Sequence, residues 1–197
     1  MTAARRNWGY TVDPPDGGWI WIPRPDESVA VWAEQVCEDL YVEGAAAVEL
    51  GEQLRSFATA LLQRAPDLGA LWIPDPVYGV LATLRSDRYK LTSTLEEIAE
   101  AERSRLEPGL AAPEVGLITL PAGPALRVRR VERQPGWLAG DLLVETVRHL
   151  VAPPGALDVD GDPTGIELLM SWTVLHEGDE FADMADQAAG LLQITGA

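Results

Sequence analysis

Residues 115–133, VGLITLPAGPALRVRRVER, decide the expected fold of the chain. A largely apolar run, 115–120, and a run of mixed apolar and charged residues, 125–133, flank residues 121–124, whose prolines and glycine are typical of a turn. This pattern predicts a β-hairpin, and the apolar runs 142–151 and 166–175 predict two further strands. Because strands joined by short connections pair antiparallel, we expect a mainly antiparallel sheet in this half of the chain.

The remaining elements follow from the spacing of apolar residues. After Asp26 and Ser28, either of which can cap a helix, apolar residues recur every three or four positions. In chain order we expect strand 18–22, helix 29–41, a second helix between Gly44 and Pro66, strands 71–73 and 77–84, helix 91–106, the four strands above, and a helix from about residue 178. Helices before, within and after the strands predict an α+β fold, an αβα sandwich with helices on both faces of the sheet.

Length and composition indicate one packed domain. The chain has 197 residues, 47% of them hydrophobic, and seven tryptophans. That is enough apolar surface for one core, and no linker divides the chain. We therefore expect a single domain over residues 1–197, with residues 1–17 as an irregular N-terminal segment.

Net charge and cysteine content exclude several classes of protein. The formal charge is −16, which disfavours binding to nucleic acid because phosphates are negatively charged. Cys37 is the only cysteine, so no internal disulfide can form. Residues 7–18 lack the apolar stretch of a signal peptide, and no run of about 18 apolar residues could span a membrane. We expect a cytoplasmic protein without membrane insertion, while the oligomeric state stays open.

No motif for catalysis, cofactors or metals stands out. Asp158, Asp160 and Asp162 alternate as at the start of a calcium-binding loop, but the glycine and the closing glutamate of such loops are missing. The two histidines, His149 and His176, are far apart in sequence and belong to no recognisable catalytic motif. We therefore expect no metal, no cofactor and no catalytic residues.

Arginines and one tryptophan form the most informative cluster. Arg127, Arg129, Arg130 and Arg133 lie on one expected strand, and Trp137 follows in a proline- and glycine-containing loop. One interpretation is a set of cross-strand ion pairs with neighbours such as Glu145. The other is a partner-binding surface, because arginine and tryptophan are enriched at interface hot spots.

The same strand carries an irregular apolar pattern. Leu126 and Val128 share one side of the alternation, whereas Val131 falls on the other. A β-bulge near Arg129 and Arg130 would bring all three onto one face. We therefore predict a bulge at this point.

Several stretches resemble a family of actinobacterial proteins. They are GWIWIP at 18–23 followed by a tryptophan-bearing helix, GVLA at 79–82, LPAGPALR at 120–127, and LLMSWTV at 168–174. In these stretches the chain resembles proteins of the LpqN/LpqT type, which have the PsbP/Mog-like αβα sandwich. The resemblance implies this fold and a binding or assembly role rather than catalysis, and it carries over no functional residue.

Two functional hypotheses follow. The first is a non-catalytic protein-interaction module, an adaptor, chaperone or assembly component, with another protein as its partner. Its expected contact residues are Arg127, Arg129, Arg130, Arg133 and Trp137. The alternative is a small-ligand-binding protein or enzyme whose site is assembled on the sheet around Arg127, Arg129, Glu145 and His149.

Overall fold

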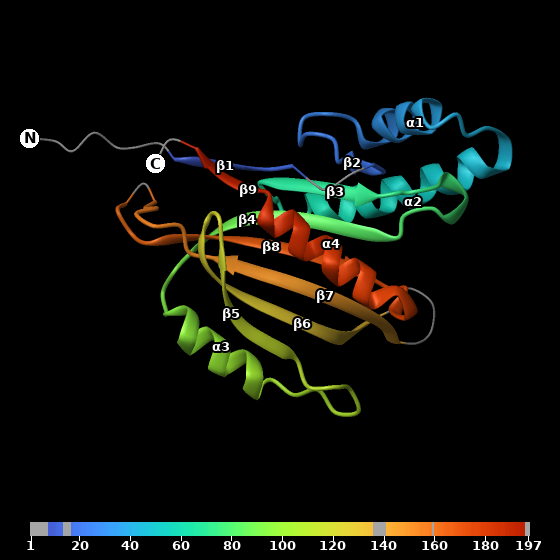
Figure 1. Ribbon diagram of the computed structural model, residues 1–197. Helices are drawn as coiled ribbons and strands as arrows, with labels where there is room; N and C mark the ends of the chain where they lie inside the picture. Colours follow the sequence, from blue (N-terminus) through green and yellow to red (C-terminus); the bar gives the residue numbers. More distant parts are fainter. Residues whose placement is uncertain (1–7, 14–16, 136–140, 159, 196–197) are drawn as a thin grey trace, which may run out of the picture. The chain divides into compact units, whose positions relative to one another are not determined.

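The computed structural model describes residues 8–13, 17–135, 141–158 and 160–195 (Figure 1). Within these residues the fold is α+β, as predicted, with a seven-stranded antiparallel sheet of order β2-β3-β4-β8-β7-β6-β5 and a two-stranded sheet β1-β9. The strands are β1 (Gly9–Val12), β2 (Trp19–Trp21), β3 (Leu68–Trp72), β4 (Ala82–Lys90), β5 (Glu114–Leu120), β6 (Gly123–Pro135), β7 (Asp141–Val151), β8 (Thr164–Trp172) and β9 (Leu192–Thr195). The α-helices are α1 (Val29–Asp39), α2 (Gly44–Leu62), α3 (Leu95–Ser104) and α4 (Gly178–Gly190), with short 3-10 helices at Pro76–Tyr78 and Leu175–Glu177.

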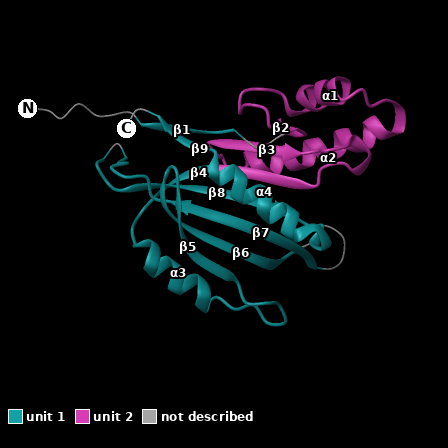
Figure 2. Cartoon of the chain, viewed as in Figure 1, with its two compact units in different colours: residues 1–15, 87–197 teal, residues 16–86 magenta. Residues whose placement is uncertain are grey.

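The chain divides into two compact units (Figure 2). One consists of residues 16–86, and the other of residues 1–15 and 87–197. Whether the two units fold as the expected single domain stays a prediction.

The unit of residues 16–86 packs α1 and α2 on β2 and β3. Leu54 of α2 and Leu71 of β3 are fully buried in its core, together with Ala33 of α1. Ser28 caps α1, because its hydroxyl accepts a hydrogen bond from the amide of Val31. The apolar stripes expected from the sequence therefore face this core.

A tyrosine in left-handed conformation ends α1. The amide of Val42 donates to the carbonyl of Cys37, and the amide of Tyr41 donates to that of Glu38, which is the hydrogen-bond pattern of a Schellman motif. Tyr41 has a φ of 55° at the position where glycine is favoured, and it is 93% exposed. The side chain therefore compensates little of the backbone strain.

Replacement of Tyr41 by glycine is expected to raise the free energy of unfolding by up to about 1 kcal/mol, because glycine has no Cβ to strain a left-handed backbone. Urea denaturation followed by circular dichroism measures the change. Tyr41→Ala is the matched control and should bring no gain, since alanine keeps the Cβ. An equal gain from alanine would show that loss of the exposed ring, and not relief of strain, is the cause.

In the unit of residues 1–15 and 87–197, helices cover both faces of β5 to β8. Leu126 and Val128 of β6 pack with Leu95 and Ala99 of α3. The residue between them, Arg127, points to the other face, where it pairs with α4. Figure 1 shows α4 lying along β7 and β8. The predicted cover on both faces of the sheet is confirmed.

The predicted β-bulge is wrong. The pairing of β6 with β7 runs without interruption from Ala125 opposite Val151 to Pro135 opposite Asp141. Arg129 instead points to the α4 face and Arg130 to the α3 face, and each meets a buried carboxylate there. Since ion pairs satisfy these positions, the strand needs no bulge to keep its alternation.

Strand β6 is longer than its neighbour β5. It has 13 residues, whereas β5 has 7 and pairs only with residues 123–129 of β6. The end of β6, residues 130–135, is still paired with β7 on its other side. One edge of β6 is therefore left without a strand beyond Arg129.

The sequence pattern did not indicate β1 or β9. The structure places β1 within residues 1–17, which were expected to be irregular, and pairs it antiparallel with β9, Gly9 opposite Thr195 and Val12 opposite Leu192. Each strand has four residues. Strands this short, paired across nearly the whole chain, leave no periodicity to recognise.

Candidate functional site

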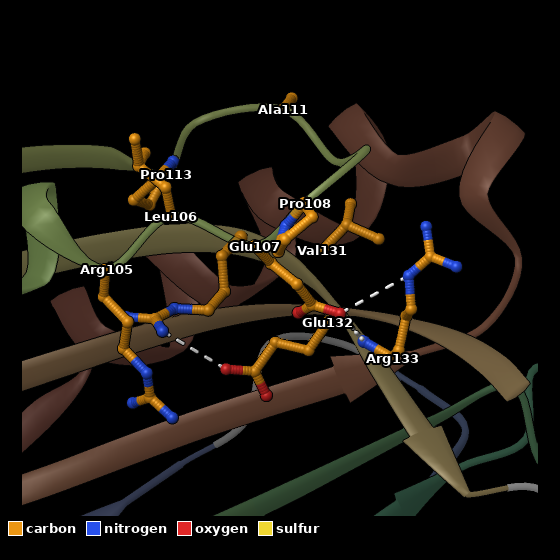
Figure 3. A pocket seen from close by; sticks show the side chains of 10 residues that line it. Arg105, Leu106, Glu107, Pro108, Ala111, Pro113, Val131, Glu132 and Arg133 are labelled. Atoms are coloured by element: carbon orange, nitrogen blue, oxygen red, sulfur yellow. Dashed lines mark hydrogen bonds and ion pairs between the residues drawn. The ribbon is translucent and has the colours of Figure 1, made fainter.

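A pocket of about 260 Å³ lies beside the unpaired end of β6 (Figure 3). One wall is the connection between α3 and β5, and the other is β6 itself. The lining residues are Arg105, Leu106, Glu107, Pro108, Ala111 and Pro113 from the connection, and Arg130, Val131, Glu132 and Arg133 from β6. We call this site the edge pocket.

The edge pocket is present because the connection after α3 neither continues this helix nor forms a strand along the end of β6. Helix α3 begins with a capping box between Thr94 and Glu97 and ends at Ser104. The following connection contains Pro108 and Pro113, which disfavour both helix and sheet pairing. It therefore runs past the end of β6 without forming a strand on it.

Backbone groups of β6 face the pocket. In an antiparallel strand the N–H and C=O of one residue point to the same side, and successive residues alternate. The amide of Arg133 points to the pocket, where it donates to the Glu107 carboxylate at 3.3 Å. The N–H and C=O of Val131 point the same way, and neither has a hydrogen-bond partner within the described ranges. The edge of β6 is therefore open at Val131.

Arg105 is the arginine of the pocket for which the described residues offer no ion pair. Arg133 Nε lies 3.5 Å from Glu107 Oε1, and Arg130 Nη1 lies 3.3 Å from Glu132 Oε1. Both pairs are drawn in Figure 3. The exposed Arg105 has no ion-pair partner in the part of the chain that the structure describes. Its guanidinium is therefore available to a carboxylate from outside.

Arg130 also belongs to a buried charge cluster beneath α3. Its guanidinium forms an ion pair with Glu102 of α3, and Arg148 Nη1 lies 3.2 Å from the same carboxylate. Arg148 Nε lies 3.4 Å from Glu167. We call these four residues the α3-face cluster. Because Glu102 holds the Arg130 guanidinium on this face of the sheet, only part of the Arg130 side chain is available to a ligand in the edge pocket.

The structure brings together the four residues of the alternative site. Arg129 Nε lies 2.7 Å from Glu145 Oε1, and His149 lies next to Arg127 because the two residues are directly paired on β7 and β6. Two carboxylates of α4 complete this α4-face cluster. The ion pairs are Arg127 with Asp186 and Arg129 with Asp179, each at 2.7 Å.

The α4-face cluster is closed by the helix above it. His149 Nε2 lies 2.9 Å from Asp186, a pairing that could serve a general base, but the His149 side chain is only 1% exposed. A Cβ added to Gly178 would collide with the Glu145 carboxylate, so the start of α4 lies directly on it. The indole of Trp172 also donates to Glu145, at 3.1 Å. The arrangement is that of a structural ion-pair network. Its Arg129–Glu145 pair is of the cross-strand kind that the sequence predicted, whereas Asp179 and Asp186 are contributed by α4.

The pKa of Asp186 lies below its ordinary value of 3.8. Burial alone would raise this pKa, but the hydrogen bonds from His149 and Arg127 favour the carboxylate and outweigh it. A depressed pKa in the folded state stabilises the fold at neutral pH. This contribution is lost as the pH falls through the folded-state pKa.

Replacement of Asp186 by asparagine is therefore expected to flatten the acid limb of the stability curve. The free energy of unfolding should fall less between pH 6 and pH 3 in the variant than in the wild type, because the variant has no carboxylate to protonate at this position. Urea denaturation at both pH values measures the difference. Identical acid losses in both proteins would contradict the prediction.

The predicted partner-binding residues divide between these sites. Arg130 and Arg133 line the edge pocket, whereas Arg127 and Arg129 face α4. Trp137 lies outside the described residues. The sequence analysis did not identify Arg105, Leu106 and Glu107 as site residues. The feature that could have indicated them is a connection with two prolines, Pro108 and Pro113, that precedes a strand shorter than the strand it pairs with.

The other candidates have local roles. The Asp158 carboxylate accepts hydrogen bonds from the amides of Asp160 and Asp162, so it stabilises a turn. His176 is exposed beside Glu177, and Cys37 is buried in α1. Among the described residues, no three His, Cys, Asp or Glu side chains are placed to hold a metal ion.

Comparisons with known proteins agree with the fold. No protein-family profile matches the chain, and no curated protein is similar to it in sequence. The crystal structure of LpqN, a protein involved in cell envelope biogenesis of Mycobacterium tuberculosis, is similar with a TM-score of 0.55 and 15% sequence identity. The similarity covers 98% of this chain and 87% of LpqN. At this identity it shows a shared fold alone.

A search of the described residues for membrane spans found no helix that is both long and apolar enough to cross a bilayer.

Proposed function

We propose that the chain is a non-catalytic protein-interaction module that binds a segment of a partner protein at the edge pocket. The observation that carries this proposal is the combination of an open strand edge at Val131, the uncommitted guanidinium of Arg105, and Leu106, which is 67% exposed. Backbone hydrogen bonds, a charge and an apolar contact are what a peptide segment can satisfy together.

The size of the pocket favours a protein partner over a small molecule. Its volume of about 260 Å³ is below the range of about 300–1,000 Å³ that is typical of pockets for drug-sized ligands. A formal charge of −16 disfavours nucleic acid. An adaptor or assembly role fits these properties.

The structural neighbour supports the same class of role. LpqN is involved in cell envelope biogenesis, and we extend only the general idea of an assembly factor to this chain. Membership of the LpqN/LpqT type with its PsbP/Mog-like fold is part of this proposal, supported by the resembling stretches and the shared fold. A cytoplasmic location is also part of it.

Replacement of Arg105 by alanine is expected to weaken partner binding by tenfold or more, because a charge-assisted hydrogen bond contributes about 1.5–3 kcal/mol. The tagged chain is used to isolate binding partners from its native host, and the affinity of a purified partner for the wild type and for the variant is measured by calorimetry. The melting temperatures of the two proteins are also measured, so that a loss of affinity is not caused by unfolding of the variant.

Arg103→Ala provides the matched control. Arg103 lies two residues away on α3, pairs only with Glu100 among the described residues, and does not line the pocket. Its replacement should leave the affinity unchanged. A partner that binds the Arg105 variant as tightly as the wild type would place the interface elsewhere and overturn the proposal.

A further inference from the structure

We infer that the partner segment binds as an extended β-strand along residues 130–135 of β6, with a carboxylate side chain on Arg105. This inference rests on the proposed function and adds the mode of binding to it. The bound segment would continue the line of β5 beyond Glu114 and so extend the sheet along β6.

The first argument is the position of the pocket. Pairing of β5 with β6 stops at Glu114 opposite Arg129, and the residues of β6 that line the pocket begin immediately after, at Arg130. Neighbouring strands lie about 4.8 Å apart, so a longer β5 would occupy this space. The edge pocket is therefore the place of a missing strand segment.

The second argument is the state of the backbone groups. Val131 offers an N–H and a C=O with no hydrogen-bond partner in the described parts of the chain. The Arg133 amide, one strand repeat further on, is held by the Glu107 carboxylate. This carboxylate occupies the position that the carbonyl of an added strand would take. An incoming strand would satisfy Val131 and replace Glu107.

The third argument is the lack of protection at this edge. Proteins usually block an open edge with a bulge, an inward charge or a proline within the strand. Here β6 pairs without a bulge through residue 135, and its only proline after Pro124 is the last residue, Pro135. Its one inward charge in this stretch, Arg130, is neutralised by Glu102 and does not block the backbone edge at Val131. The connection from α3 covers the edge only in part, because the pocket remains beside it.

The charges in the edge pocket indicate which kind of partner segment binds there. Glu107 and Glu132 are each paired with an arginine of β6, which leaves the guanidinium of Arg105 for a carboxylate of the bound segment. A second copy of this chain is a less favourable occupant, because two copies, each of formal charge −16, repel one another over their whole surfaces, whereas a short segment with one carboxylate meets mainly the local charge of Arg105. We therefore assign the edge to an extended segment of a different protein.

The test uses a defined probe, the heptapeptide acetyl-TVEVTVT-amide, and the full-length chain labelled with ¹⁵N. On addition of about 1 mM peptide, the amide signals of Val131 and Arg133 should shift and their hydrogen exchange should slow, because the Val131 amide gains a hydrogen bond and the Arg133 amide exchanges an exposed carboxylate for a backbone carbonyl of the added strand. The same peptide with glutamine for glutamate should bind about tenfold more weakly.

Two further controls separate strand addition from other modes. Two peptides are N-methylated on alternate residues, one on the odd and one on the even positions. The peptide whose methylated amides would face β6 should not bind, and the other should bind like the unmodified peptide. Glu107→Ala should raise the affinity several-fold, because the carboxylate no longer competes for the Arg133 amide.

The outcomes distinguish this inference from the proposed function. If the peptide fails to bind at about 1 mM, or binds without protecting Val131 and Arg133, strand addition is wrong. The native partner tests the proposed function separately: a partner that requires Arg105 but leaves both amides exchanging freely would keep the edge pocket as the interface and still overturn the strand-addition mode.

Discussion

Replacement of Glu145 by alanine is expected to lower the free energy of unfolding by about 3–5 kcal/mol, because it removes the buried partner of a buried charge. The Arg129 side chain is only 18% exposed, loses the Glu145 carboxylate at 2.7 Å and keeps only the exposed Asp179. The indole of Trp172 loses its acceptor at the same time. Urea denaturation monitored by circular dichroism measures the loss.

Asp179→Ala is the matched control for this prediction. Asp179 also lies 2.7 Å from Arg129, but its side chain is 94% exposed. Exposed ion pairs contribute about 0–1 kcal/mol, so this variant should remain close to the wild type. Equal losses for Glu145→Ala and Asp179→Ala would show that burial does not determine the strength of the α4-face cluster.

Replacement of Glu102 by leucine is expected to have an effect of similar size on the other face of the sheet. Glu102 is buried and pairs with both Arg130 and Arg148. Leucine supplies no charge, so two guanidinium groups beneath α3 lose their common carboxylate. The expected loss in the free energy of unfolding is about 3–5 kcal/mol.

A triple variant tests the reason for this loss. Glu102→Leu combined with Arg130→Met and Arg148→Met replaces the ions with apolar side chains of similar length. Since a well-packed apolar substitute can match a buried ion pair, the triple variant should recover most of the lost stability. If it is as unstable as Glu102→Leu alone, packing at position 102 rather than the uncompensated charge is responsible.

The order of the main elements could be predicted because their signals are local. The turn at residues 121–124 and the two runs that flank it correspond to the hairpin of β5 and β6, with a register that pairs Leu120 with Gly123. The capping hydroxyl of Ser28 similarly defines where α1 begins. The strand expected at 77–84 lies later, as β4, because residues Pro76–Tyr78 form a 3-10 turn capped by Asp75.

The burial of the arginines could not be predicted, because their partners are remote in sequence. Arg127 and Arg129 resembled a charged surface strand, yet their carboxylates on α4 lie 59 and 50 residues further along the chain. Alternation alone assigns Arg130 to the opposite face, but it cannot indicate that Glu102 meets it there. The sequence thus supported cross-strand pairing without showing that helices would complete the clusters.

The edge pocket also lies beyond local patterns. It depends on where β5 stops relative to β6, and Val115 to Leu120 can be recognised as a strand without indicating that pairing ends opposite Arg129. Arg105 could not be predicted as a site residue, because the sequence does not show which charged residues lack an ion-pair partner. Only the structure shows that Arg105 has none among the described residues. Residue types at hot spots pointed to Arg130 and Arg133, the two members that do line the site.

The pairing of β1 with β9 determines how the molecule responds to a pulling force. The two strands run antiparallel, with Gly9 opposite Thr195, so a load applied through the two ends of the chain acts on both strands at the same end of their ladder. Such a load opens the hydrogen bonds one pair after another instead of shearing them together. The small sheet should therefore unzip at low force, before β6 and β7, whose long ladder lies far from either end of the chain.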